Sequence, residues 1–188
     1  MGSNSDNVGG KSIEEKISYL KNHISSYPDF PKPGILFRDM FSLLRDPTAF
    51  RVLKDVMVEY TRNNIGEAEV VVGLESRGFL FGSILAIELG LPFVPIRKPG
   101  KLPGALNKVT YSLEYGTDTF EIQRESIKPG QNILIVDDLL ATGGSLNAAT
   151  TLIADCQAKV SGCLVIMELA DLNGRTKVKA PIHSLMSF

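Results

Sequence analysis

The stretch from Ile133 to Ser145 places the strongest constraint on the fold of this chain. Ile133 to Val136 are four consecutive apolar residues that favour β-structure, a pattern typical of a strand buried on both faces, as in a parallel sheet. Asp137 and Asp138 follow at once. Two adjacent carboxylates at the end of a buried strand repel each other. The arrangement costs little only where solvent, a metal or the hydroxyl groups of a ligand take up the charge.

A loop of small residues and a helical pattern come next. The loop consists of Ala141, Thr142, Gly143, Gly144 and Ser145. Apolar residues at helical spacing then run from Leu146 to Cys156. Small residues let backbone N–H groups turn towards one point, and the N-terminus of the following helix adds its partial positive charge, so the loop can cradle a phosphate. Acids that can hold hydroxyl groups beside such a loop predict a site for a ribose 5-phosphate.

Simpler interpretations exist for each half of this pattern. A Gly-Gly pair between a strand and a helix is usually only a tight connection, and an Asp pair at a strand end is often a solvated turn. The two together, in this order, favour the binding site. The standard nucleotide loops do not fit, because no Lys follows the glycines as in a P-loop and no spaced Gly-x-Gly-x-x-Gly follows the strand.

Two other segments carry cations that suit a ligand rich in phosphate. The first is a strand–helix junction formed by Glu75, Ser76 and Arg77. Its Arg is either a surface cap or part of an anion loop, since guanidinium matches phosphate oxygens. The second is a Gly/Pro-rich stretch with the cations Arg97, Lys98 and Lys101. Such a run is usually a solvated face, but beside a diphosphate it is placed to cover the leaving group.

The spacing of apolar residues predicts an α/β fold. Helices are expected over residues 12–25, 47–60, 78–89 and after the glycine loop, single strands over 70–74, 93–96, 133–136, 159–168 and 182–188, and a hairpin over 109–115 and 119–123. Ser12 and Glu15 predict a capping box, and the prolines of residues 28–33 argue against regular structure there. Alternating strands and helices imply a mostly parallel sheet with helices on both faces, and ligands gather at the carboxyl ends of such strands.

Composition and charge exclude several classes of function. A length of 188 residues suits one domain with a full core, and a net charge near −1 gives no electrostatic footprint for nucleic acid or anionic membrane. No apolar run approaches the length of a transmembrane helix. Met1 to Gly10 are expected to be a disordered leader or a sequence left by an expression vector, with the domain over residues 11–188. Cys156 and Cys163 are expected to be buried thiols of a cytoplasmic protein.

Several segments together resemble the type I phosphoribosyltransferases. The resembling segments are residues 27–39, 75–79, 97–104, 111–116 and 136–145, and the similarity covers nearly everything from Ile13 to the C-terminus. Within this family the chain is similar to members that act on adenine. The resemblance implies a central, mostly parallel sheet flanked by helices, with a small hood and a flexible lid loop. It also implies a cis bond between Glu75 and Ser76, with Glu75 standing where some members have Asp.

The resemblance implies a reaction as well: adenine and 5-phosphoribosyl 1-diphosphate (PRPP) give AMP and pyrophosphate, with Mg²⁺ held mainly through PRPP. Asp137 and Asp138 would hold the ribose hydroxyl groups, and residues 141–145 would wrap the 5′-phosphate. The residues expected around the diphosphate are Glu75, Ser76, Arg77, Lys98 and Lys101. Arg97 would reach the diphosphate of a neighbouring subunit, so that a homodimer forms part of the site.

The resemblance implies a base site and a lid. The residues that would bind adenine are Leu36, Phe37, Arg38 and Leu169. Phe37 and Leu169 would sandwich the base, while the backbone of Arg38 reads its polar edge. Glu114 is the candidate catalytic residue, which contacts adenine N7 and manages its proton. Tyr115 belongs to the lid, whose closure would keep water from the activated sugar.

Two alternative functions remain. A phosphoribosyltransferase for hypoxanthine or guanine is the nearest, although residues 30–39 and Glu114 argue against it. A PRPP-sensing regulator that lost catalysis belongs to a different class. Such a regulator would be expected to carry a DNA-binding module, and the sequence shows neither a basic helix-turn-helix nor a basic surface signal.

Overall fold

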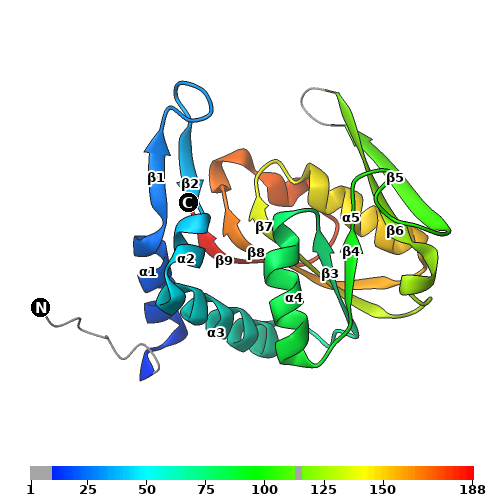
Figure 1. Ribbon diagram of the computed structural model, residues 1–188, viewed down its shortest axis with the longest axis horizontal. Helices are drawn as coiled ribbons and strands as arrows, with labels where there is room; N and C mark the ends of the chain where they lie inside the picture. Colours follow the sequence, from blue (N-terminus) through cyan, green and yellow to red (C-terminus); the bar gives the residue numbers. More distant parts are fainter. Residues whose placement is uncertain (1–9, 113–115) are drawn as a thin grey trace, which may run out of the picture. The chain divides into compact units, whose positions relative to one another are not determined.

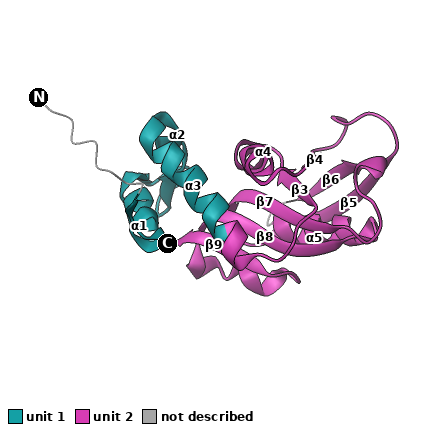
Figure 2. Ribbon diagram, turned by 90° about the horizontal axis from the view of Figure 1, so that it is seen from below, with its two compact units in different colours: residues 1–60 teal, residues 61–188 magenta. Residues whose placement is uncertain are grey.

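The structure, a computed structural model, describes residues 10–112 and 116–188. Internal contacts divide the chain into two compact units, residues 1–60 and 61–188, which Figure 2 shows in different colours. Glu114 and Tyr115 lie outside the described residues. The expectation of one domain over residues 11–188 stays a prediction.

The first unit begins with a helix whose N-terminus is capped as predicted. Its elements are α1 (Ile13–His23), β1 (Ser25–Pro28), β2 (Leu36–Asp39), α2 (Phe41–Arg45) and α3 (Pro47–Asn64), the last of which runs on into the second unit. The Glu15 N–H donates to Ser12 Oγ at 3.3 Å, and the Ser12 N–H donates to Glu15 Oε2 at 2.7 Å. This reciprocal capping box satisfies two N–H donors that the first turn of a helix leaves unpaired.

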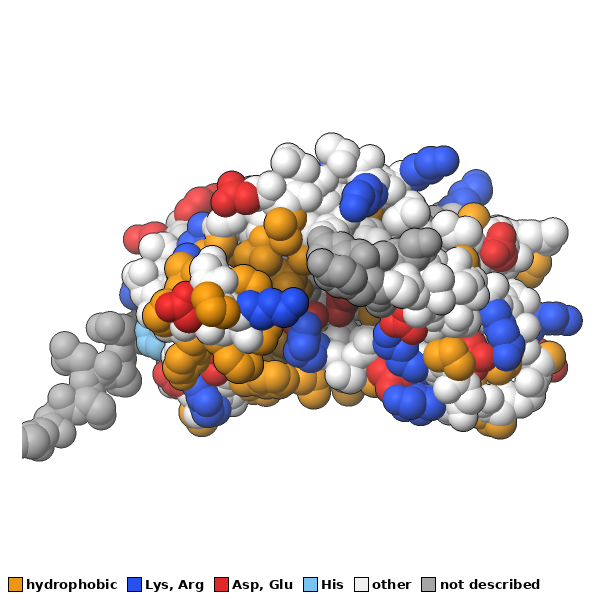
Figure 3. Space-filling model, turned by 90° about the horizontal axis from the view of Figure 1, so that it is seen from above, with side chains coloured by type: hydrophobic (Ala, Val, Ile, Leu, Met, Phe, Trp, Pro, Cys, Tyr) orange, Lys and Arg blue, Asp and Glu red, His pale blue; other side chains and the backbone are white. Residues whose placement is uncertain are grey.

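β1 and β2 form an antiparallel hairpin with Ser26 opposite Arg38 and Pro28 opposite Leu36. The prolines were expected to prevent regular structure here, and that prediction is wrong at the end of β1. Pro28 is tolerated because it is the last residue of a strand in a two-stranded sheet. Large apolar side chains of the first unit remain exposed, and Figure 3 shows them as an orange patch; they are Tyr27, Phe30, Ile35, Leu36, Phe37 and Phe41.

The second unit is built on a five-stranded parallel sheet (Figure 1). Its elements are β3 (Val70–Leu74), α4 (Arg77–Leu89), β4 (Phe93–Ile96), β5 (Leu106–Ser112), β6 (Thr117–Gln123), β7 (Asn132–Leu140), α5 (Gly144–Asp155), β8 (Lys159–Glu168) and β9 (Ile182–Ser187), with short 3-10 helices η2 (Arg124–Ser126), η3 (Ala170–Leu172) and η4 (Gly174–Lys177). The strand order is β4-β3-β7-β8-β9, and every neighbouring pair is parallel. The predicted central parallel sheet flanked by helices is confirmed.

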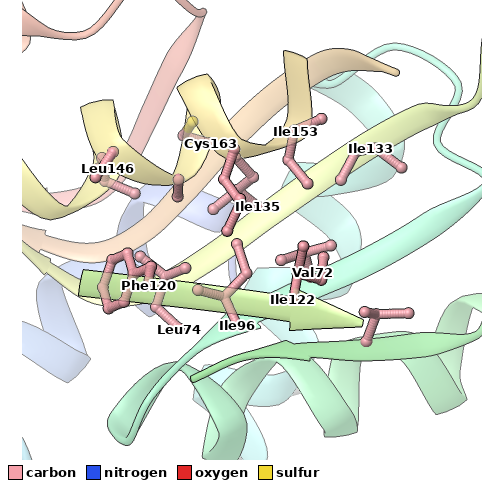
Figure 4. Packing of buried hydrophobic residues seen from close by; sticks show 14 of the residues in the cluster. Val72, Leu74, Ile96, Phe120, Ile122, Ile133, Ile135, Leu146, Ile153 and Cys163 are labelled. Atoms are coloured by element: carbon pink, nitrogen blue, oxygen red, sulfur yellow. The ribbon is translucent and has the colours of Figure 1, made fainter. Parts of the chain in front are cut away.

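α4 and α5 cover opposite faces of this sheet. Since successive residues of a strand point to opposite sides, neighbouring residues of one strand face different helices. On the α5 face, Val72, Ile135 and Cys163 pack with the helix in a buried apolar cluster, which the antiparallel β5–β6 hairpin also joins through Phe120 (Figure 4). On the α4 face, a Cβ on Gly73 would lie 2.7 Å from the Phe93 ring. A residue without a side chain is therefore needed there for the ring to pack between strand and helix.

Several element ends differ from the expected ones. β7 continues through Asp137 and Asp138 to Leu140 instead of ending before them, because β8 stays paired with it as far as Leu140 opposite Glu168. α1 ends before Ser25, which pairs with Asp39 in the hairpin. α3 extends beyond its expected end at residue 60, and α2 was not expected at all.

The two cysteines lie where the sequence places them. Cys156 and Cys163 are free, buried thiols, and burial raises the pKa of Cys163 to about 12. Within residues 10–112 and 116–188, no helix has both the length and the apolar character needed to cross a membrane.

The core predicts a matched pair of stability effects. Ile135 is fully buried in the α5-face cluster, whereas Ile87 on α4 is 80% exposed. Replacing Ile135 with Ala removes buried methyl groups and leaves a cavity, so the free energy of unfolding should fall by about 2–5 kcal/mol. Ile87→Ala should change it by less than about 0.5 kcal/mol. Urea denaturation of both variants measures this, and equal losses would contradict the assigned core.

Candidate functional site

The candidate site lies at the carboxyl edge of the parallel sheet, where the strand order changes direction. The chain passes from β3 to β4 on one side of β3 and returns as β7 on its other side, so the segments after β3 and β7 separate around one point. Residues 75–77 follow β3 directly, while Asp137 and Asp138 lie near the end of β7. Parallel pairing therefore brings two segments that are far apart in the sequence to one edge.

A cavity of about 330 Å³ occupies this position. It is lined by residues 75–77 and 137–146, so it brings together both acids, the whole glycine loop and the strand–helix junction. The bond between Glu75 and Ser76 is cis, as the family resemblance implied. The binding roles of these residues stay predictions, but their assembly around one space is a property of the fold.

The two acids have different surroundings. Arg77 Nε donates to Asp138 Oδ2, and the Asp138 side chain is buried. Burial raises the pKa of Asp137 well above its usual range, and the neighbouring charge of Asp138 raises it further. The sequence argument expected solvent, metal or ligand to take up the charge of the pair, whereas Arg77 of the chain itself takes up part of it. Of the two acids, Asp137 is therefore the one whose ionised form a ligand would stabilise most.

The glycine loop is held by backbone packed on backbone. Gly143 has φ +81°, and a Cβ there would lie 2.3 Å from the carbonyl oxygen of Gly174. Gly78, in the first turn of α4, is equally restricted, because its Cβ would lie 2.6 Å from the Val136 oxygen. α5 begins at Gly144, and its N-cap residue, Gly143, has no side chain to cap the helix. The N–H groups of that first turn, at the cavity wall, are therefore suited to bind an anion.

Glu75 gathers the cations that the sequence singled out. Its carboxylate accepts from Lys101 Nζ at 2.5 Å, from the Lys98 N–H at 2.9 Å and from Arg97 Nε at 3.2 Å. Burial alone would raise the pKa of Glu75, but these donors outweigh it and lower the pKa to about 2. Glu75 is thus an anion throughout the physiological range and serves as counter-ion to the predicted diphosphate-binding segment.

The same segment is tied to the β5–β6 hairpin. Arg97 and Glu121 exchange backbone hydrogen bonds at 2.9 and 2.8 Å, and the Gly100 N–H donates to Glu121 Oε2 at 3.0 Å. Lys98 Nζ forms an ion pair with Asp118 of β6. The start of the predicted lid is therefore anchored by specific contacts, and a ligand that binds its cations must compete with carboxylates of the chain.

The residues predicted to bind the base belong to both units. Leu36, Phe37 and Arg38 lie on β2, and the Arg38 side chain donates to Ser26 Oγ at 2.7 Å. Leu169 follows β8, and its N–H donates to the oxygen of Leu140, a residue of the cavity wall. Because these residues are divided between the units, the sandwich of the base stays a prediction. Glu114 and Tyr115 lie outside the described residues, so their roles stay predictions as well.

Sequence reasoning missed the segment behind the glycine loop. Gly174 contacts the loop, and its neighbour Arg175 bonds to Glu168 at the end of β8. The signal that could have indicated it is the Asn173–Gly174 pair, a typical turn sequence that lies a few residues beyond the end of the long buried strand β8. Among the described residues no group of three or more His, Cys, Asp or Glu side chains could hold a metal ion.

Comparison with known proteins agrees with this geometry. The model of the phosphoribosyl transferase domain family matches residues 41–185. An adenine phosphoribosyltransferase of Drosophila pseudoobscura pseudoobscura is 54% identical over 177 residues, which cover 94% of this chain and 98% of that protein. A crystal structure of the Saccharomyces cerevisiae adenine phosphoribosyltransferase, complexed with adenine and an imino-altritol bisphosphate, matches with a TM-score of 0.86 and 45% identity, covering 92% of this chain and 99% of that one. The chain belongs to the phosphoribosyl transferase family and, within it, to the adenine phosphoribosyltransferases.

The raised pKa of Asp137 predicts a pH-dependent gain in stability on mutation. A carboxyl whose native pKa is raised favours the fold below its unfolded-state pKa of about 4, and that stability is lost as the pH rises through the native value. Asp137→Asn keeps an oxygen for the Asp138 N–H, which donates at 2.9 Å, but carries no charge. We expect the variant to melt above the wild type at neutral pH, with the difference shrinking towards pH 4.

Scanning calorimetry across this pH range measures the effect. Asp171→Asn, at an exposed position of the same unit, serves as the control and should show no such trend. A melting temperature of Asp137→Asn equal to or below that of the wild type at neutral pH would contradict the burial of a charge at this position.

Proposed function

We propose that the chain transfers the 5-phosphoribosyl group of PRPP to adenine and releases AMP and pyrophosphate. The observation that carries the proposal is the single cavity that holds the acid pair, the glycine loop and the junction at residues 75–77. The relationship to adenine phosphoribosyltransferases supports it, as does the yeast structure, whose ligands are adenine and a bisphosphate.

In this proposal the cavity seats PRPP by its three chemical parts. The first turn of α5 and the glycine loop bind the 5′-phosphate through backbone N–H groups. Asp137 and Asp138 accept hydrogen bonds from the ribose hydroxyl groups. Arg77 is already positioned by Asp138 and points its remaining donors to the diphosphate. Ligand hydroxyl groups beside Asp137 would relieve the cost of its buried charge.

Catalysis must stabilise the diphosphate as it leaves and hold the two reactants in line. Positive charge develops on the sugar when the bond to the diphosphate breaks before the base is fully attached, as in glycosyl transfer. Arg77, Lys98 and Lys101 would neutralise the leaving group. Mg²⁺ binds oxygen ligands and usually keeps several that do not come from the protein. Among the described residues of the cavity wall, Asp137, Asp138 and Glu75 carry carboxylates, and Glu75 is already paired with Arg97 and Lys101, so Mg²⁺ would be held mainly through the oxygens of PRPP.

The hairpin geometry supports recognition of adenine by main-chain atoms of Arg38. Pro28 has no N–H, so its pair with Leu36 is of the non-hydrogen-bonded kind, and by alternation so is the pair of Ser26 with Arg38. The backbone N–H and C=O of Arg38 therefore point away from β1. We propose that the N–H donates to adenine N1 and the C=O accepts from the 6-amino group.

The remaining parts of the proposal concern the lid and the assembly. Glu114 manages the proton of adenine N7, and Tyr115 belongs to the lid that excludes water. Arg97 reaches the diphosphate of a second subunit when the protein is a homodimer. The free thiols Cys156 and Cys163 support a reducing compartment such as the cytoplasm.

The assay that tests the function measures pyrophosphate release from PRPP and Mg²⁺ with adenine, hypoxanthine, guanine or no base. We expect turnover with adenine and strong rejection of hypoxanthine, whose protonated N1 and 6-oxo group face the Arg38 backbone with donor against donor and acceptor against acceptor. Each unsatisfied buried group costs about 1–3 kcal/mol. Two of them imply a ratio of kcat/KM of roughly 10²–10⁴.

Arg38→Ala is the informative variant in this assay. If main-chain atoms recognise adenine, the preference for adenine over hypoxanthine should remain when the side chain is removed. Comparable efficiency of the wild type on hypoxanthine would contradict the choice of adenine. Lost selectivity in Arg38→Ala alone would contradict only the main-chain account. PRPP binding without turnover on any base would favour a regulator instead.

A second prediction concerns Glu114. Glu114→Gln should lower kcat by about 10²–10⁴-fold, the usual contribution of a general acid or base, and should raise the PRPP KM much less. The expected reason is that the group acts on the base and not on the sugar phosphate. Steady-state kinetics with Glu125→Gln, an exposed glutamate of the same unit, as control separates the two constants. An unchanged kcat would assign the proton transfer to another group.

A further inference from the structure

Two glycines pack back to back behind the glycine loop. The Cβ of a side chain at Gly174 would lie 2.2 Å from the oxygen of Ala141 and 3.0 Å from the nitrogen of Gly143. In return, a Cβ at Gly143 would lie 2.3 Å from the oxygen of Gly174. The backbone of η4 thus forms the rear wall of the loop, at a distance that only glycine permits.

The residue next to this contact is fixed by a dense set of hydrogen bonds. Arg175 donates from Nε and Nη2 to the two oxygens of Glu168, each at 2.6 Å, in a fork-to-fork pair. Nη2 also donates to Ser184 Oγ at 2.8 Å, and Nη1 donates to the Ile182 oxygen at 2.7 Å. Ser184 Oγ in turn donates to Glu168 Oε2 at 2.7 Å. Arg175 is thereby bound to the end of β8 and to β9 at once.

Glu168 is itself a rigid anchor. Its side chain is only 9% exposed, and its backbone pairs with Leu140 of β7 on one side and with Ser187 of β9 on the other. The pKa of Glu168 is lowered, first by its hydrogen bond with Arg175, so it remains a charged partner at neutral pH. A continuous path of contacts therefore leads from the sheet through Arg175 and Gly174 to the loop.

We propose that Arg175 is a positioning residue for the 5′-phosphate loop, which it holds in place through Gly174. The inference rests on the proposed function. Arg175 does not line the cavity, so it acts through the loop and not on the substrate.

The loop needs such support because its two adjacent glycines leave the backbone conformation weakly determined by the local sequence. Gly143, the N-cap residue of α5, has no side chain to cap the helix. It also takes a left-handed conformation, which is only one of many backbone conformations open to glycine. Several N–H groups must converge on one phosphate, and a displacement of about 1 Å in a positioned group can cost about 10²-fold. Support from behind keeps these donors aligned before the ligand arrives.

The test compares Arg175→Gln, Arg175→Lys and Gly174→Ala with the wild type by steady-state kinetics and by calorimetric binding of AMP. We expect Arg175→Gln and Gly174→Ala to raise the PRPP KM and the AMP Kd by about 10- to 100-fold, while the adenine KM stays unchanged. Arg175→Lys keeps the charge but cannot form the fork, so its effect should be intermediate. Arg62→Gln, which loses a single exposed bond to the Glu88 oxygen, is the matched control and should behave as the wild type.

A rise in the KM for PRPP without a rise in the KM for adenine distinguishes a positioning role from a merely structural one. A variant that is only less stable has fewer active molecules, which lowers the apparent kcat and leaves the PRPP KM unchanged. If Gly174→Ala and Arg175→Lys behave in this way, the inference is overturned. These two variants decide the question even if Arg175→Gln does not fold. Equal rises in both KM values would overturn it too. A wild type inactive with every base would instead overturn the proposed function.

Discussion

The parallel pairing of β3 with β7 is the constraint on which the site depends. It sets Val70 to Gly73 beside Ile133 to Val136, so the chain leaves both strands at the same edge. The junction at residues 75–77 and the acid–glycine segment at residues 137–145 are thereby placed around one cavity, although neither could form a site alone. The apolar faces of the two strands are buried under α4 and α5, and the energy of that burial is what holds polar groups of like charge together at the edge. Function and core are thus linked through the same two strands.

Close approach of backbones is the second condition. Gly78 lets α4 approach β7 at Val136, and the Gly143–Gly174 contact lets η4 support the loop. Each position excludes a side chain because the atoms it would meet are backbone oxygens, which cannot move aside as a flexible side chain can. Glycine at these positions leaves N–H groups close to the ligand space while the surrounding sheet removes the freedom that glycine would otherwise have.

Much of this arrangement was predictable from the sequence, and the exceptions have physical causes. The apolar runs from Val70 to Leu74 and from Ile133 to Val136 predicted the buried strands, and the acid pair with its glycine loop predicted which edge carries the site. The extension of β7 through its acids was not predictable, because it depends on pairing with β8, a long-range contact that local pattern does not encode. The support by Arg175 was missed for a similar reason. Its partners Glu168 and Ser184 belong to two different strands, β8 and β9, and only the pairing of these strands brings both of them to Arg175.

The cations of the site have carboxylate partners before any ligand binds, and this determines what a ligand can gain. Arg77 is paired with Asp138, Lys98 with Asp118, and Lys101 and Arg97 with Glu75. A diphosphate bound by these cations, as proposed, would therefore replace one anionic partner with another, and its affinity would reflect the difference between two sets of charge-assisted hydrogen bonds. In the ligand-free chain these donors outweigh the burial of Glu75 and hold its pKa at about 2, so a ligand that withdraws them would raise that pKa. A diphosphate that draws the cations from Glu75 would leave a largely buried carboxylate without its partners, which weakens the binding of substrate and product alike.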